Sequence, residues 1–258
     1  MFLAIDIGNT NITVGLFAAS GNKILPKPQK TWRMSTVKGQ TADEYGAMLM
    51  DMFFYSGFDS SKIKNIAVAS VVPALNAVFE ELILKYFNKK AFFVNYKNSG
   101  KLKFAVSNPK EVGADRIADA IAAYGIYGGG CVVIDFGTAT TFDCIDLKGK
   151  YLGGVIAPGP AISAQSLNLK TAQLPQVEMK NPGNAIGKTT IECIQSGLYF
   201  GYIGLIKEII ARIKKEMMVK KIIATGGLAE LMTGEIKEIK INDPDLTLEG
   251  IRIIFETR

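Results

Sequence analysis

The chain of 258 residues contains no histidine. Imidazole is the side chain that titrates near neutral pH and a common metal ligand, so its absence excludes several kinds of active site. A histidine general base, a Ser-His-Asp triad and a histidine-ligated metal are all ruled out. Proton transfer must therefore be carried out by aspartate, glutamate, lysine, tyrosine or water.

Cysteine is scarce as well. The three cysteines, Cys131, Cys144 and Cys193, are odd in number and show no C-x-x-C spacing. This pattern does not indicate a disulfide framework or a zinc site. We expect three small, buried, apolar side chains in a reducing compartment.

Long apolar runs are missing too. The longest covers residues 120–134 and is interrupted by three glycines, Gly128 to Gly130, so it is too short for a membrane span. The amino terminus enters a strand at once, without a basic region or a cleavage site. We therefore expect a soluble, cytoplasmic protein that does not associate with membranes.

The formal net charge is +6, yet no basic stripe with interleaved aromatic residues is present. The basic residues occur as pairs at the ends of expected helices, where they complement the helix dipole: Lys89-Lys90, Lys214-Lys215 and Lys220-Lys221. Such a diffuse positive field suits a small anionic substrate, and we expect no nucleic-acid partner.

One motif occurs twice, half a chain apart. An apolar run ends in Asp6-Ile-Gly8-Asn-Thr10, and a second ends in Asp135-Phe-Gly137-Thr-Ala. The two aspartates are separated by 129 positions, which is half of the 258-residue chain. With 48% hydrophobic residues the chain can bury two cores. The repeat predicts a duplicated domain.

Each copy predicts a β-hairpin, in which the glycine adopts a positive φ at the turn. Backbone N–H groups at the tip and the hydroxyls of Thr10, Thr13, Thr138 and Thr140 are donors suited to phosphate oxygens. The aspartate adds a carboxylate that can hold a cation against that phosphate. For either copy alone, a plain Asp-x-Gly turn is the alternative.

The remaining pattern predicts alternating helices and strands after each hairpin. In the first half we expect a strand at residues 30–35, a helix at 41–55, a strand at 66–71, a helix at 73–87 and a strand at 91–95. In the second half we expect a strand at 151–156, helices at 161–169 and 190–217, a strand at 221–225, a strand at 238–241 and a final helix at 247–255. The fold class is α/β with mixed sheets. A boundary between Ala114 and Gly130 gives domains 1–117 and 118–258.

Several motifs together resemble the type III pantothenate kinases over essentially the whole chain. They are the Asp6 hairpin, Asn108-Pro109-x-Glu-Val-Gly113-Ala-Asp115-Arg116, the Asp135 hairpin, Gly153-Gly154-x-Ile-x-Pro158-Gly159, Gly187-Lys188-Thr189-Thr190, Thr225-Gly226-Gly227 and the closing stretch from Asp243 to Gly250. The hairpins alone are shared by the wider actin and sugar-kinase superfamily. Gly113-Ala-Asp115-Arg116 is the discriminating segment.

The resemblance implies two duplicated ribonuclease-H-like domains with ATP in a cleft between them. It implies ATP-dependent phosphorylation of pantothenate to 4'-phosphopantothenate, the first step of coenzyme A biosynthesis. A homodimer, Mg²⁺ or a similar divalent cation, and an activating K⁺ or NH₄⁺ are also implied.

The resemblance also implies residue roles. ATP would be bound by Asp6, Ile7, Gly8, Asn9, Thr10, Asn11, Ile12, Thr13, Thr138, Gly226 and Gly227. Pantothenate would be bound by Gly113, Ala114, Asp115, Arg116 and Thr190, with Asp115 as the catalytic base. Asp6 would hold the divalent cation with ATP, and Asp135 would hold the monovalent cation.

Two of these segments have simpler interpretations, and a third stretch resembles an unrelated motif. Asp115 lies in the first turn of an expected helix, where the helix dipole should keep its pKa low, and it can be an ordinary helix-start carboxylate beside a surface Arg116. Thr189 or Thr190 can simply cap the next helix. Gly183 to Thr189 imitates a P-loop, but the glycine spacing is too short and no buried strand precedes it.

Two other functions remain open. The first is another kinase or a polyphosphate hydrolase of the same superfamily, which would share Asp6 and Asp135 but has no need for Gly113-Ala-Asp115-Arg116. The second is a non-catalytic relative that binds nucleotide or assists transcription, which would be expected to lose one of these carboxylates. The long apolar helix Ile191 to Ile213, which carries Tyr199, Phe200, Tyr202 and Ile203, is expected to form part of a dimer interface.

Overall fold

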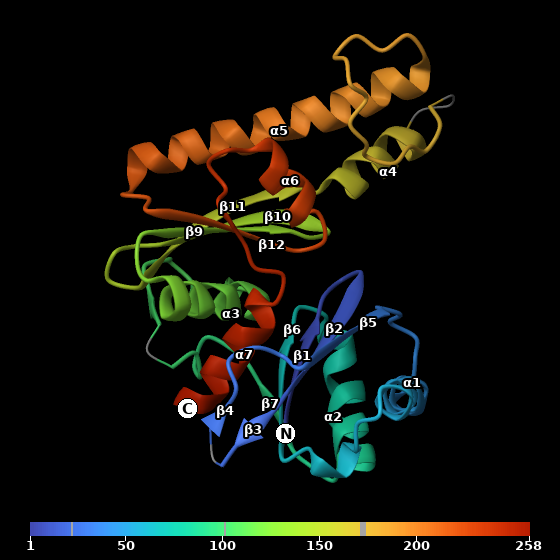
Figure 1. The fold of residues 1–258 in the computed structure, drawn as a ribbon, viewed down its shortest axis with the longest axis vertical. Helices are drawn as coiled ribbons and strands as arrows, with labels where there is room; N and C mark the ends of the chain where they lie inside the picture. The colour runs from blue at the N-terminus through green and yellow to red at the C-terminus, as the bar shows by residue number, and fades with distance from the viewer. Residues whose placement is uncertain (22, 101, 171–173) are drawn as a thin grey trace. The chain divides into compact units, whose positions relative to one another are not determined.

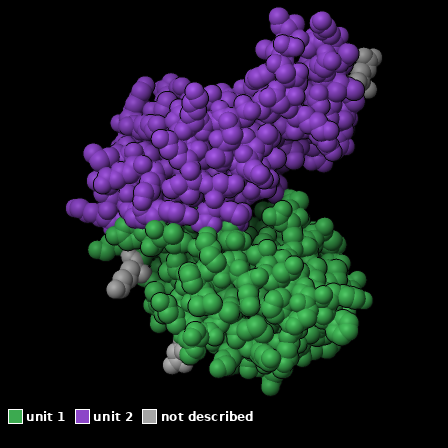
Figure 2. All heavy atoms as spheres, in the orientation of Figure 1, with its two compact units in different colours: residues 1–126, 245–258 green, residues 127–244 purple. Residues whose placement is uncertain are grey.

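A computed structural model describes residues 1–21, 23–100, 102–170 and 174–258. The chain forms two compact units, which are coloured separately in Figure 2. Unit 1 contains residues 1–126 and 245–258, and unit 2 contains residues 127–244. No helix of the described residues is both long and apolar enough to cross a membrane.

Unit 1 is built around a five-stranded mixed sheet with the order β5-β2-β1-β6-β7 (Figure 1). Strands β1, β2 and β5 form an antiparallel meander, and β6 and β7 continue the sheet in parallel with β1. The strands are β1 (Phe2–Ile7), β2 (Asn11–Phe17), β5 (Lys30–Ser35), β6 (Asn65–Ser70) and β7 (Ala91–Phe93), with short strands β3 (Ala19–Ser20), β4 (Lys23–Ile24) and β8 (Lys103–Phe104) outside it.

Helices cover both faces of this sheet. On one face, α1 (Ala42–Tyr55) and α2 (Pro73–Phe87) pack on alternate residues of β1, namely Leu3, Ile5 and Ile7. On the other, α3 (Ala114–Ala122) and α7 (Leu246–Thr257) pack on Phe2 and Ala4. Alternation along β1 therefore directs Asp6 to the α3 face.

Unit 2 repeats the topology of unit 1. Its strands run in the order β13-β12-β9-β10-β11, again an antiparallel meander extended by two parallel strands. The strands are β9 (Cys131–Phe136), β10 (Ala139–Ile145), β11 (Lys150–Pro158), β12 (Lys221–Thr225) and β13 (Ile241–Asn242). The shared order confirms the duplicated α/β fold that the repeated motif predicts.

The helices of unit 2 are α4 (Pro160–Lys170), α5 (Thr190–Glu216) and α6 (Ala229–Glu235). Helices α5 and α6 cover one face of the sheet and pack on Val132, Ile134 and Phe136 (Figure 1). In α5, Tyr199, Tyr202 and Ile203 are buried within this core, whereas Phe200 is 38% exposed. The unit 2 sheet thus covers much of the apolar surface of α5, and Ile191 and Phe200 stay exposed.

The compact units differ from the expected division after residue 117. Residues 118–126 belong to unit 1, and α7 returns to unit 1 from the end of the chain. The reason is close helix packing, since a Cβ on Gly250 of α7 would lie 2.0 Å from the carbonyl oxygen of Ala118 in α3. Helix α3 then ends in a π-helical turn, Ala123–Tyr127, at the border of the two units.

Most expected elements agree with the structure to within one or two residues. Strands β5 and β12 and helix α2 have the expected bounds. Strand β13 begins only at Ile241, later than expected. Short 3-10 turns that the sequence did not indicate occur at Ser60–Lys62 and Pro109–Glu111. Cys131 and Cys144 are buried as expected, but Cys193 is exposed.

Candidate active-site residues

The first hairpin places polar groups at its tip. The N–H of Gly8 donates to the carbonyl oxygen of Asn11 at 3.0 Å, and the Thr36 hydroxyl donates to the carbonyl oxygen of Gly8 at 2.7 Å. Asn9, Thr10 and Asn11 are exposed, and Asp6 and Thr13 are partly buried. The tip is thus a fixed loop that carries exposed polar side chains.

One detail of the hairpin prediction is wrong. Neither Gly8 nor Gly137 has a positive φ. A Cβ on Gly8 would instead lie 3.0 Å from the carbonyl oxygen of Asn11, so close contact with the opposite strand explains this glycine. The side chains of Ile7 and Ile12 are buried in the core, so only their backbone groups are available to a ligand.

Asp115 lies in the first turn of α3, and its carboxylate folds back over the start of the helix. Its Oδ1 accepts a hydrogen bond from the N–H of Arg116 at 2.7 Å. A Cβ on Gly113 would lie 2.4 Å from this Oδ1 atom, so position 113 must be glycine for the carboxylate to adopt this place. The Gly113-Ala-Asp115 sequence therefore has a direct steric explanation.

Burial raises the pKa of the Asp115 carboxyl, although the Arg116 N–H and the Arg116 charge act in the opposite direction. Our expectation of a low pKa is wrong because loss of hydration outweighs the favourable helix start. A carboxylate with a raised pKa is a better proton acceptor.

Asp6 and Asp115 belong to the same end and the same face of the unit 1 sheet. The N–H of Val71, just after β6, donates to the carbonyl oxygen of Ile7 at 3.1 Å. The Val71 side chain in turn lies 3.3 Å from the position of a Cβ on Gly113. The structure therefore brings together the ends of β1 and β6 and the start of α3.

In unit 2, the second hairpin is packed by two glycines. Gly226 has φ +88°, and a Cβ there would lie 2.3 Å from Oδ1 of Asp135. A Cβ on Gly159 would lie 2.4 Å from the carbonyl oxygen of Thr138. Gly227 is open, with nothing within 4 Å of such a Cβ. The structure thus places Asp135, Thr138 and Gly226 close together. Gly159 also packs against this hairpin, and the Pro158-Gly159 pair was its one sequence signal.

Thr140 is not a phosphate-facing donor. Its side chain is fully buried, and its hydroxyl is hydrogen-bonded to the hydroxyl of Tyr202 from α5. Burial raises the pKa of Tyr202 to about 12, with a further contribution from the negative charge of Asp135. Strand alternation explains the error, since residues 140 and 142 face α5, whereas the exposed Thr138 lies in the turn.

At the start of α5, the structure supports the simpler interpretation, helix capping, for Thr189. Thr189 is the N-cap, and with Glu192 it forms a capping box. Thr190 is the first helical residue and is exposed. Residues 174–189 contain no helix or strand, which confirms that Gly183 to Thr189 is not a P-loop.

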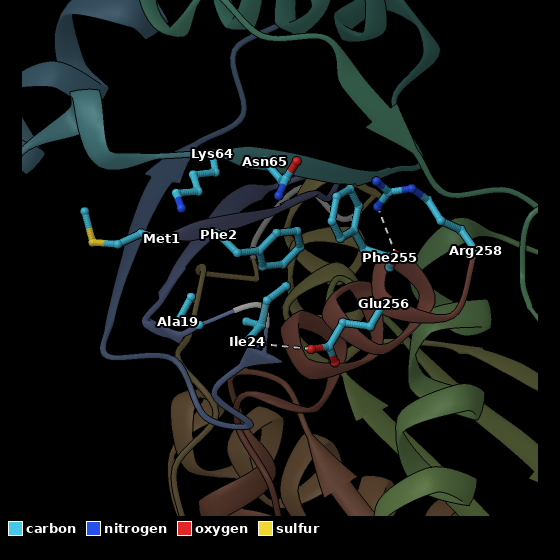
Figure 3. Close-up of a pocket in the computed structure, with 10 residues that line it drawn as sticks. Met1, Phe2, Ala19, Ile24, Lys64, Asn65, Phe255, Glu256 and Arg258 are labelled. Carbon is cyan, nitrogen blue, oxygen red and sulfur yellow. Dashed lines mark hydrogen bonds between the residues drawn. The ribbon is translucent and has the colours of Figure 1, made fainter.

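The hollow shown in Figure 3 contains none of the expected site residues. It measures about 370 Å³, and Phe2, Asn65 and Phe255 line it at the amino end of β1 and β6. Dashed lines in Figure 3 mark the bonds from the Ile24 N–H to Glu256 and from Arg258 to the Phe255 carbonyl oxygen. Because Asp6 lies near the carboxyl end of β1, this hollow is separate from the candidate site.

Comparisons with known proteins agree with the residue pattern. A family model described as type III pantothenate kinase matches residues 2–212. A protein named Type III pantothenate kinase from Endomicrobium trichonymphae is 67% identical over 256 residues, which cover 99% of each chain. Another of that name from Moorella thermoacetica is 45% identical over 257 residues, again 99% of each chain.

Solved structures show the fold alone. A conserved putative Baf family transcriptional activator from Campylobacter jejuni has a TM-score of 0.59 and 23% identity, with 98% of this chain and 97% of that chain covered. A putative 2-dehydro-3-deoxygalactonokinase from Sinorhizobium meliloti has a TM-score of 0.58 and 10% identity, with 99% and 96% covered. The family match and the full-length relatives carry the assignment further: this chain belongs to the type III pantothenate kinases.

Proposed function

We propose that this chain transfers the γ-phosphoryl group of ATP to the primary hydroxyl of pantothenate, giving 4'-phosphopantothenate and ADP. This is the first step of coenzyme A biosynthesis, and the proposal includes a cytoplasmic location, where ATP is available. The observation that carries it is the carboxylate of Asp115, which has a raised pKa and lies at the same end and face of the sheet as Asp6.

Asp115 acts as the base in this proposal. Its carboxylate orients the pantothenate hydroxyl and accepts the proton as the oxygen bonds to the γ-phosphorus and the bond to ADP breaks. Phosphoryl transfer has a loose transition state, so positioning and charge neutralisation contribute more than a strong base does. Gly113, Ala114, Arg116 and Thr190 bind the rest of pantothenate.

The two hairpins bind the nucleotide. Polar groups at the first tip and the exposed Thr138 at the second are suited to phosphate oxygens, and Gly226 with the open Gly227 leaves room for adenosine. The residues proposed for ATP are Asp6, Ile7, Gly8, Asn9, Thr10, Asn11, Ile12, Thr13, Thr138, Gly226 and Gly227, with Ile7 and Ile12 acting through their backbone.

The donor set fits the proposed cations. Among the described residues no group of three or more histidine, cysteine, aspartate or glutamate side chains gathers to form a metal site. Mg²⁺ is often held by one or two carboxylates together with substrate phosphates, and Asp6 supplies such a carboxylate. Asp135 would hold K⁺ or NH₄⁺. When bound, these cations neutralise phosphate charge.

A homodimer is part of the proposal. Exposed apolar side chains gather on α4, on the segment before α5 and on the first half of α5, and they include Leu169 at 70%, Ile186 at 86% and Ile191 at 50% exposure. Apolar surface of this kind marks association sites. Light scattering that shows a monomer would contradict this part.

The test is ADP release with Mg²⁺ and K⁺, measured with and without pantothenate. We expect release to depend on pantothenate in the wild-type protein and to be lost in Asp115→Asn. Release that is unchanged by pantothenate would contradict the assignment and favour a hydrolase of the same fold.

A further inference from the structure

A hollow of about 490 Å³ in unit 2 is lined by lysines from several elements. The five lysines are Lys214, Lys220, Lys221, Lys237 and Lys240. We refer to it as the lysine hollow. Its volume lies within the range of small-molecule sites in proteins.

The lysine hollow lies at the opposite end of the sheet from the second hairpin. Strands β9 and β12 run in parallel, with Lys221 beside Cys131 and Thr225 beside Asp135. The rise of a strand puts about 13 Å between these two ends. A ligand in the hollow would therefore be separate from one held at Asp135 and Gly226.

Helix capping does not account for this arrangement. Lys214 is in the last turn of α5, where it complements the helix dipole. Lys220 and Lys221 instead lie at the start of β12, and Lys237 and Lys240 lie between α6 and β13. Folding thus brings together lysines that lie apart in the sequence.

The backbone around the lysine hollow is held firmly. The N–H groups of Lys220 and Lys221 both donate to the carbonyl oxygen of Gly130, at 2.7 and 3.2 Å. The ammonium group of Lys221 donates to the carbonyl oxygen of Tyr127. These bonds fix one wall, so a ligand would not have to order it.

The charge of the lysine hollow is not balanced from within. Glu238 is its one acidic lining residue, and in the described part of the chain none of the five lysines has an ion-pair partner. Val219, Ile222 and Ile241 supply apolar wall. Charge of one sign beside a low-dielectric wall focuses the electric field and attracts counter-ions.

We propose that the lysine hollow binds a small oligophosphate anion. Five lysines against one glutamate leave four positive charges, which a single phosphate cannot neutralise but a chain of about three phosphoryl groups can. Among the residues that the structure describes, no aromatic side chain lines the hollow, so none of them would stack on a nucleobase. The polyphosphate part is therefore the recognised chemistry.

The test is a titration of the full-length protein with inorganic tripolyphosphate, without Mg²⁺ and near physiological ionic strength, followed by NMR of backbone amides. We expect saturable shifts at Val219, Ile222 and Ile241, separate from any shifts at Gly226 and Gly227. The double variant Lys237→Gln/Lys240→Gln should weaken binding at the first three amides by at least tenfold.

The matched control is Lys148→Gln/Lys207→Gln, which removes the same charge from exposed sites in unit 2 outside the hollow. It should change the affinity less than twofold, and both double variants should keep pantothenate kinase activity. Equal weakening by both variants would show only a diffuse effect of net charge and overturn the proposal. So would an absence of saturable shifts below about 10 mM, or a marked preference for a nucleoside over tripolyphosphate at these amides.

Discussion

Replacing Gly113 by alanine tests whether the position of the Asp115 carboxylate limits catalysis. The new Cβ would lie 2.4 Å from Asp115 Oδ1, whereas ordinary contacts begin at 3.4 Å. The carboxylate would have to retreat by about 1 Å, or give up its 2.7 Å hydrogen bond from the Arg116 N–H. A misplacement of about 1 Å can lower a rate by roughly 10²-fold.

We therefore expect Gly113→Ala to lower kcat by roughly 10²-fold, equivalent to about 2.7 kcal/mol, with the KM for ATP nearly unchanged. The backbone at Gly113 has φ −58°, which alanine adopts without strain, so the loss of stability should stay near 1 kcal/mol, as for a weakened N-cap. Coupled ADP release gives the rate, and urea denaturation gives the free energy of unfolding.

Two controls separate a displaced carboxylate from a weakened helix. Gly113→Ser restores a good N-cap side chain but keeps the Cβ, so it should be as inactive as alanine. Gly39→Ala adds a Cβ in open space and should have no effect. Recovery of activity in Gly113→Ser, or a loss below threefold in Gly113→Ala, would refute the steric argument.

The remaining predictions concern four other side chains. Asp115→Asn should cut turnover by roughly 10²-fold or more with ATP binding retained, whereas Asp6→Asn should mainly impair use of metal-bound ATP, and equal loss of ATP affinity in both would contradict these roles. Because the pKa of Asp115 is raised in the folded state, its contribution to stability is present below the unfolded-state pKa and is lost as the pH rises. The acid limb of the rate profile should therefore lie above the usual aspartate range, and urea denaturation near neutral pH should show Asp115→Asn no less stable than wild type. Activity should rise when K⁺ replaces Na⁺, and Asp135→Ala should abolish that response. Tyr202→Phe should lower the free energy of unfolding by about 1–3 kcal/mol, since it leaves the buried Thr140 hydroxyl without its partner, and denaturation would test this.

Periodicity and turn residues were sufficient to predict most of the fold. The duplicated motif indicates two similar sheets, and five strands of each observed sheet follow the same order. The return of α7 to unit 1 was not predictable, because a terminal helix pattern carries no information about which sheet it covers. The close contact of Gly250 with Ala118 places α7 in unit 1. A glycine within a helix is only a weak sequence signal for such a contact.

The site was predicted less evenly. The family resemblance singled out Gly113, Asp115 and Gly226, and the repeated motif singled out Asp135. The structure shows that each glycine makes room for its neighbouring carboxylate. The direction of the Asp115 pKa shift could not be predicted, because the helix start is a local property whereas burial depends on residues distant in sequence. The motif predicts Thr140 to lie at the tip of the hairpin, but this residue already belongs to β10 and faces the core.

The two units share one topology, but their hairpin aspartates have different neighbours. In unit 1, the face of the sheet beside Asp6 receives the start of α3, and with it a second carboxylate, Asp115. In unit 2, the equivalent aspartate is met by the backbone of Gly226, where any side chain would collide with Asp135. A second acidic side chain would collide with Asp135 at position 226. Under the proposed function, proton transfer is therefore assigned to unit 1, and Asp135 is left for a cation. In this proposal the repeated hairpin provides the phosphate-binding groups of each unit, and the residues that follow the parallel strands give the two units different roles.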